Sequence, residues 1–144
     1  MQLKNLVIDS KSAWVEFPGL PGFEIEVVIL SRKELQGVRK RCITQKLDRK
    51  TRQMEEVLDE DKFVTEFTKA TVRNWKGLSL EHLETLILID TDGKNMKDLV
   101  PYSYENAEIL VGQSAEFDSW LNEVVFDLDN FRTEPSGGAV EKAN

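Results

Sequence analysis

Nine basic side chains lie within 21 residues of this sequence, and they are its densest cluster of groups that could do chemistry. Two acidic residues, Glu34 and Asp48, oppose them, so the segment carries a net charge of +7. Such a segment binds anions: an acidic protein, a nucleic acid or the acidic part of a second copy. The alternative is a solvated helix face followed by a charged loop. The nine residues are Arg32, Lys33, Arg39, Lys40, Arg41, Lys46, Arg49, Lys50 and Arg52.

The sequence disfavours nucleic acid as the partner of this segment. No aromatic residue occurs between residues 32 and 52, so no platform for stacking bases is present there. From residue 53 to the end, 8 basic residues stand against 20 acidic ones, and a net charge of −12 repels a polyanion. We therefore expect a protein partner before DNA or RNA.

Residues suited to catalysis or metal binding are sparse. The chain has one histidine, His82, and one cysteine, Cys42, which excludes an internal disulfide and a zinc site built on several such ligands. Residues 90–93 (Asp-Thr-Asp-Gly) fail as a calcium loop, because glycine falls at the fourth position and Pro101 at the twelfth, so we predict a turn. No glycine-rich phosphate loop is present. We expect no catalytic residues, no metal and no cofactor, and hence no enzyme.

Length and composition describe one folded domain. The chain has 144 residues, of which 40% are apolar and 31% charged, with a formal net charge of −7. This balance is typical of globular proteins, and a chain of this length buries about 68–70% of its unfolded surface. No apolar run is long enough to span a bilayer, and the first residues lack the apolar core of a signal peptide. We expect no membrane contact and a reducing, cytosolic compartment.

Alternating apolar and polar residues predict a β-hairpin over about residues 13–30. Residues 13–17 and 23–27 alternate, and the Pro/Gly-rich residues 18–22 form the loop between them. Residues 3–8 form either a short additional strand or an irregular segment.

The spacing of apolar residues then becomes helical. Ser31 and Glu34 fit a capping box in front of a helix over about 32–45, in which Cys42 is a small buried residue. The polar residues 48–56 predict a loop.

A second helix is predicted over about 60–74, with Gly77 well placed to end it. Residues 78–89 fit either a helix or, at 86–89, a short buried strand.

Two further helices are predicted in the C-terminal part. Ser103 or Tyr102 begins a short helix that ends at Gly112, and Ser114 caps a strongly amphipathic helix over about 115–131.

These elements together predict an α+β fold. An N-terminal β-hairpin over about 13–30 is followed by a mainly α-helical body of four or five helices over about 31–131. Residues 1–131 form a single domain, and residues 132–144, poor in apolar side chains, form a disordered tail.

Three short clusters occur in order in the second half of the chain. They are Asn-Trp-Lys-Gly-Leu at 74–78, Pro-Tyr-Ser-Tyr-Glu-Asn-Ala at 101–107, and Glu-Phe-Asp-Ser-Trp at 116–120 with Asp-Asn-Phe at 129–131. This order resembles the tail assembly chaperones of long-tailed bacteriophages. Gly-Phe-Glu-Ile-Glu at 22–26 and Leu-Ser-Arg-Lys-Glu-Leu at 30–35 resemble one branch of that family. The resemblance covers about residues 12–132, and residues 84–100 match nothing in it.

The resemblance implies a non-enzymatic chaperone that binds the tape-measure protein, a long and largely helical chain that sets tail length. Such chaperones keep it soluble until tail-tube subunits polymerise around it, and they are then displaced without the use of nucleotide. The resemblance also implies the host cell cytoplasm, absence from the mature virion, and the tail-tube protein as a further candidate partner. The alternative function is a small adaptor whose basic segment 32–52 binds an acidic protein or nucleic acid.

A chaperone of this kind covers apolar surface, so large apolar side chains are the first candidates for contact with the client. Tyrosines suit a half-wet surface because each keeps a polar tip. Ordinary core packing is the alternative for every candidate. The candidates are Trp75, Leu78, Tyr102, Tyr104, Phe117 and Trp120.

The division of charge also predicts self-association through the nine basic residues. The basic segment of one copy would dock on the acidic second half of another, and repetition of this heterologous contact gives a homo-oligomer, either a ring or an open spiral. Such an assembly weakens at high salt.

Overall fold

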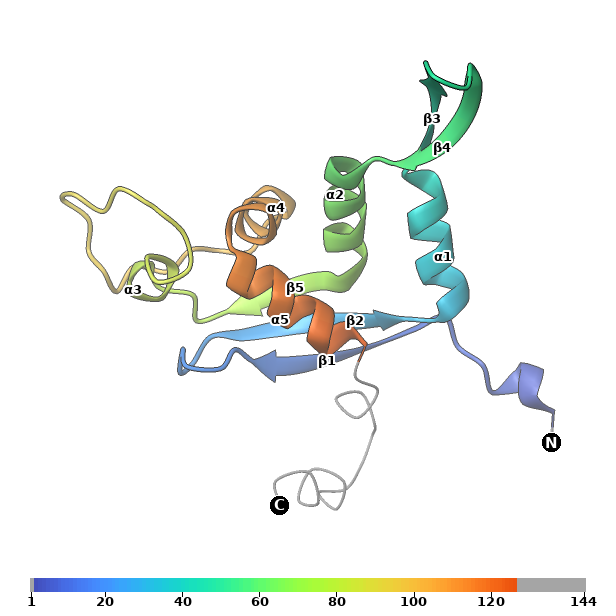
Figure 1. Cartoon of the computed structure of the whole chain (residues 1–144). Coiled ribbons are helices and arrows are strands. Elements are labelled where there is room, and N and C mark those ends of the chain that lie inside the picture. Colours follow the sequence, from blue (N-terminus) through green and yellow to red (C-terminus); the bar gives the residue numbers. More distant parts are fainter. Residues whose placement is uncertain (1, 127–144) are drawn as a thin grey trace.

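The computed structural model describes residues 2–126 of the chain, and these residues form an α+β fold (Figure 1). The predicted fold class is confirmed: a β-hairpin near the N-terminus is followed by a body that contains five α-helices within the described residues. Residues 127–144 lie outside the described part, and with them the predicted tail 132–144 and the end of the predicted helix 115–131.

The N-terminal hairpin consists of β1 (Ser10–Glu16) and β2 (Glu24–Leu30), which pair antiparallel. The predicted hairpin is confirmed, although β1 begins three residues earlier than expected. Alternation places Val15 and Ile25 opposite each other on the covered face of the sheet. Residues 3–8 contain a single 3-10 turn, η1 (Leu3–Asn5), and no strand, so of the two alternatives for this segment the irregular one is confirmed.

The helix predicted over 60–74 is wrong in its last residues. The helix α2 (Glu60–Thr71) ends earlier, and β5 (Val72–Lys76) follows it directly and pairs antiparallel with β2, giving the sheet order β1-β2-β5. Burial of Val72 and Trp75 against the sheet outweighs the helical spacing that they share with α2. Gly77 therefore follows a strand and not a helix.

The first predicted helix is real but shorter than expected. It is α1 (Arg32–Arg41), and the Ser31 hydroxyl accepts a hydrogen bond from the Glu34 amide at 3.1 Å. The second half of the predicted capping box is absent, because the Ser31 amide donates to the Asp9 carbonyl at 2.8 Å instead. This bond ties the start of β1 to the start of α1.

The predicted loop over 48–56 is wrong, as is the helical end at 42–45. These residues form a second hairpin, β3 (Ile43–Asp48) and β4 (Gln53–Leu58), which projects beyond α1 and α2 (Figure 1). The apolar alternation that marks a half-buried strand is weak here, because both faces of the hairpin are largely solvated. The polar composition of these residues therefore does not distinguish a solvated hairpin from a loop.

Between residue 78 and the last described residue, 126, the chain forms three helices. The helix α3 (Leu80–Leu83) is short, and the alternative of a strand at 86–89 is wrong. Ser103 caps α4 (Tyr104–Gln113), which ends one residue beyond Gly112. Ser114 caps α5 (Ala115–Val125), as predicted, and Phe126 closes it.

One hydrophobic core lies between the three-stranded sheet and the helices. The helices α1, α2 and α5 pack on β2, while α4 packs on α2 and α5 (Figure 1). The largest fully buried side chains are those of Phe23, Phe117, Ile25, Leu78, Leu110 and Leu121.

Candidate functional site

The five aromatic residues among the predicted client contacts belong to one connected chain of rings. Neighbouring ring centroids in this chain lie 5.3–6.3 Å apart. Phe23, which immediately precedes β2, was not among the predicted contacts, yet its ring joins the two halves of this aromatic chain. The order is Trp120, Phe117, Phe23, Trp75, Tyr102 and Tyr104.

The two ends of this aromatic chain differ in burial. Phe117 is 0% exposed and Trp120 9% exposed, and both contact Phe17 in the core, Phe117 stacked on its ring and Trp120 tilted against it. In this conformation they present almost no surface to a client. At the other end Tyr102 is half-buried and Tyr104 is 59% exposed.

Two hydrogen bonds fix the end of the aromatic chain that contains Trp75 and Tyr102. The Trp75 indole N–H donates to the Val100 carbonyl at 2.9 Å, and the Tyr102 hydroxyl donates to the Val72 carbonyl at 2.8 Å. Burial raises the pKa of Tyr102, with a smaller contribution from the charge of Tyr104. Both bonds attach the segment before α4 to strand β5.

A small apolar cavity of about 60 Å³ opens beside Trp75. It lies between α3, the segment that follows α3, and α4. Trp75 and Leu78, two of the predicted client contacts, line it together with partly exposed side chains. Those side chains include Leu83, Ile87, Val100 and Ile109. The structure therefore brings four predicted contacts close together. Trp75 and Leu78, 5% and 1% exposed, form the inner wall of the cavity, and the two tyrosines continue the chain of rings from Trp75.

The most exposed apolar side chains of this region neighbour the cavity. Leu88, 99% exposed, follows the lining residue Ile87, and Leu99, 65% exposed, precedes Val100. Ile109 is itself 47% exposed. Leu88 and Leu99 were not predicted as contacts, because they lie in the segment 84–100, which the family resemblance does not cover. Ile109 lies on α4, outside the inward face that Ala107, Leu110 and Val111 form. We call Leu88, Leu99, Tyr104 and Ile109 the apolar rim.

A second group of exposed apolar side chains precedes β1. Leu3, Leu6, Val7 and Ile8 are each more than half exposed. The apolar run at residues 6–8 was visible in the sequence, which left open a short strand or an irregular segment and did not identify a free surface.

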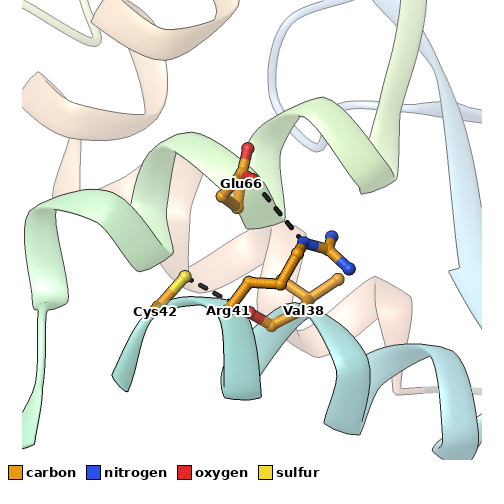
Figure 2. A network of polar contacts seen from close by, with 4 residues as sticks. All are labelled: Val38, Arg41, Cys42 and Glu66. Atoms are coloured by element: carbon orange, nitrogen blue, oxygen red, sulfur yellow. Dashed lines mark hydrogen bonds and ion pairs between the residues drawn. The ribbon is translucent and has the colours of Figure 1, made fainter. Parts of the chain in front are cut away.

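All nine basic residues of the segment 32–52 are exposed, on α1 and on the β3–β4 hairpin. On α1, Lys33, Arg39 and Lys40 line a shallow depression of about 450 Å³. Arg41 is drawn toward α2, where its Nε lies 3.7 Å from Glu66 Oε1 (Figure 2). Beside it, the buried Cys42 donates from its thiol to the Val38 carbonyl at 3.2 Å (Figure 2).

A shallow acidic groove, open to solvent, lies on the outer face of α4. It has a volume of about 510 Å³ and is lined by Glu105, Glu108, Ile109, Gly112 and Gln113. Glu108 accepts a hydrogen bond from the Thr65 hydroxyl at 2.8 Å, which fixes one wall against α2. Because α2 packs against both α1 and α4, the basic and acidic surfaces lie on either side of it.

Two features that could suggest catalysis or metal binding, His82 and the turn at residues 90–93, have structural roles. His82 lies 3.1 Å from the Pro21 carbonyl through Nε2, which joins α3 to the β1–β2 loop. Residues 90–93 form the predicted turn, in which Asp92 donates its amide to the Asp90 carboxylate at 3.0 Å. Within residues 2–126, no three His, Cys, Asp or Glu side chains gather as a metal site would require. No helix in the same range is long and apolar enough to cross a membrane.

The fold and these surfaces define a small α+β protein that carries an apolar rim, a basic face and an acidic groove. Comparison with known proteins finds no matching family model, no matching curated protein and no matching solved structure. The function is therefore argued from the residues of this chain.

Proposed function

We propose that this protein is a non-enzymatic phage tail assembly chaperone, which binds the helical tape-measure protein and keeps it soluble until the tail tube polymerises. The proposal combines the motif resemblance with one structural observation. That observation is the apolar cavity lined by Trp75 and Leu78, beside which Leu99 and Ile109 are exposed.

The cavity suits one side chain of a helical client. At about 60 Å³ it is smaller than the cavity of about 150 Å³ that accepts a benzene molecule, so it admits part of an apolar side chain. An amphipathic helix projects anchors at i, i+3, i+4 and i+7. One anchor would enter beside Ile87 and Ile109, and its neighbours would cover Leu88, Leu99 and Tyr104.

A shallow site of this kind favours release. A holdase must bind its client strongly enough to prevent aggregation, yet it must be displaced when the tail-tube protein arrives. The described site offers a small apolar cavity and a half-exposed rim instead of a deep pocket, so we expect modest affinity.

Co-expression with a tape-measure protein, the long helical client that the proposal names, tests this function. The soluble fraction of that client is measured with wild-type protein, with Leu99→Asp, and with no chaperone. We expect wild-type protein to keep the client soluble and Leu99→Asp to lose most of this effect, because a carboxylate on the rim opposes apolar contact.

Leu6→Asp is the matched control, since Leu6 and Leu99 are comparably exposed but lie in different parts of the fold. It should protect the client as wild-type protein does. A client that is equally soluble with and without this protein contradicts the proposed function.

A second candidate function is an adaptor whose basic segment binds an acidic protein or nucleic acid. The exposure of all nine basic side chains favours it. A gel-shift assay with duplex DNA and with single-stranded RNA, repeated at increasing salt, separates the two functions. Salt-sensitive shifts support the adaptor, because neutralised phosphates release counterions.

A further inference from the structure

The β3–β4 hairpin has little support from the rest of the described chain. It forms a sheet of two strands, and neither outer edge pairs with another described strand. Except for Asp48 beside the turn, its half-buried residues lie near its base, where the Asp59 amide donates to the Cys42 carbonyl at 2.7 Å. Because an isolated two-stranded hairpin is marginally stable in water, a partner that covers this one would stabilise it.

The tip of the hairpin combines apolar and basic side chains. Leu47 and Met54 are paired across the strands, and they are 56% and 59% exposed. The turn that follows them carries Arg49, Lys50 and Arg52, all exposed. We call these five residues the hairpin tip. Its partner needs an apolar contact flanked by carboxylates.

The acidic groove on α4 has that composition. Ile109, 47% exposed, provides the apolar contact, and Glu105 and Glu108 flank it. Gly112 leaves one side of the groove without a side chain, and the volume of about 510 Å³ leaves room for a hairpin turn.

The hairpin and the groove of one molecule do not meet. The hairpin projects beyond α1 and α2, whereas α4 packs on the other side of α2 (Figure 1). The groove is lined by α4 residues alone and contains no hairpin residue. The two surfaces are thus available to different copies.

We propose that the hairpin tip of one copy docks in the acidic groove of a second copy of this chain. Leu47 and Met54 then cover Ile109, and the cations of the turn face Glu105 and Glu108. The contact joins different surfaces, so it repeats from copy to copy. The inference is independent of the proposed client.

Charge outside the contact steers the same encounter. The segment 32–52 carries +7, whereas residues 104–125, which comprise α4 and α5, contain five acidic residues and no basic one. Opposed net charges of this size raise the association rate and select this orientation over like-charged ones. The orientation brings α1 toward the acidic half of the neighbour.

Sedimentation velocity over a range of protein concentrations tests the docking, at about 0.15 M and about 1 M salt. We expect wild-type protein to associate reversibly and to dissociate at the higher salt. Arg49→Glu with Lys50→Glu in the turn, or Glu105→Lys with Glu108→Lys in the groove, should weaken association at least about tenfold. An equimolar mixture of the two double variants should associate again, because each reversed surface meets a complementary one.

Matched controls separate docking from general charge effects. Lys94→Glu with Lys97→Glu reverses two exposed cations away from the hairpin. Glu116→Lys with Glu123→Lys reverses two exposed carboxylates on α5, and Glu116, like Glu105, is the second residue of its helix. The Lys94 and Lys97 control should associate like wild-type protein. The α5 control removes charge that steers the encounter but none from the contact itself, so it should slow association yet weaken it much less than the docking variants do. Circular dichroism of every variant checks that the fold is retained.

Three results would overturn the inference. Wild-type protein that stays monomeric at all concentrations removes the contact. Double variants that associate as wild-type protein does, or a mixture that fails to reassociate while each partner is folded, place the contact elsewhere. A hairpin that binds duplex DNA through Arg49 and Lys50, in a monomeric protein, assigns it to a different class of partner.

Discussion

Gly77 lies directly against the backbone carbonyl of Gly22, so that a β-carbon at position 77 would overlap this carbonyl group. Gly77 follows β5 and Gly22 precedes β2, and the approach closes the end of the sheet beside Trp75 and Phe23. Gly77 also has a φ of +76°, a conformation that favours glycine.

Gly77→Ala should therefore destabilise the protein strongly. The left-handed backbone costs about 1–2 kcal/mol with any L side chain, and displacement of the Gly22 carbonyl adds about 1–3 kcal/mol. Urea denaturation measures the loss. Gly93→Ala is the matched control, because Gly93 has a φ of +72° and nothing within 4 Å of its β-carbon position. Equal losses in the two variants would show that the close approach to Gly22 is unimportant.

The hydrogen bond from Tyr102 to Val72 predicts a stability loss with a pH signature. At neutral pH, Tyr102→Phe should cost about 1 kcal/mol, the usual net value of such a bond. Burial raises the pKa of Tyr102 in the folded protein above the unfolded value of 10.0. Above that pH the unfolded chain releases this proton first, which favours unfolding.

The contribution of the protonated Tyr102 is thus complete below about pH 10 and is lost as the pH rises through the folded pKa. Thermal denaturation from pH 8 to 11, compared between wild-type protein and Tyr102→Phe, measures it, and wild-type protein should lose more stability above about pH 10. Parallel pH profiles for the two proteins would contradict the prediction.

Phe117 and Tyr104 should separate core packing from client contact. Phe117 is fully buried, so Phe117→Ala should cost about 3–5 kcal/mol of unfolding free energy. Tyr104→Ala, at a side chain that is 59% exposed, should change it by about 0.5 kcal/mol or less but reduce protection of the client. Chemical denaturation and the client-solubility assay measure the two effects. A stable Phe117→Ala protein that fails to protect the client would show instead that Phe117 contacts the client.

The sequence predicted those elements in which the spacing of the apolar residues indicates one buried face. The hairpin of β1 and β2, the Ser31 and Ser114 caps, and the apolar face of α5 were all predictable, since periodicity and capping are local signals. The second hairpin and β5 were missed for a different reason. The strands β3 and β4 bury neither face, and β5 continues from α2 without a break and is defined by pairing with β2. Both depend on tertiary context, which single-sequence spacing does not carry.

The candidate surfaces were only partly predictable for a similar reason. Aromatic content selected Phe117 and Trp120 together with Tyr102 and Tyr104, but aromatic side chains fill cores as readily as surfaces. The apolar run at 86–89 fitted a helix or a buried strand, so it gave no sign that Leu88 is exposed, and Leu99 lies in the segment that the family resemblance does not cover. Charge segregation, in contrast, is visible in the sequence because charged side chains stay on the surface whatever the fold.

Ile109 belongs to both proposed binding surfaces, since it lines the apolar cavity and the acidic groove. A client helix over the cavity and the hairpin tip of a second copy in the groove would therefore compete for this side chain. We expect synthetic peptides that tile the helical client to dissociate the self-associated protein, in proportion to their affinity. Sedimentation velocity with labelled peptide detects this as a smaller complex that carries the label. Peptide bound to the intact assembly at undiminished size would show instead that client and neighbour occupy separate parts of α4.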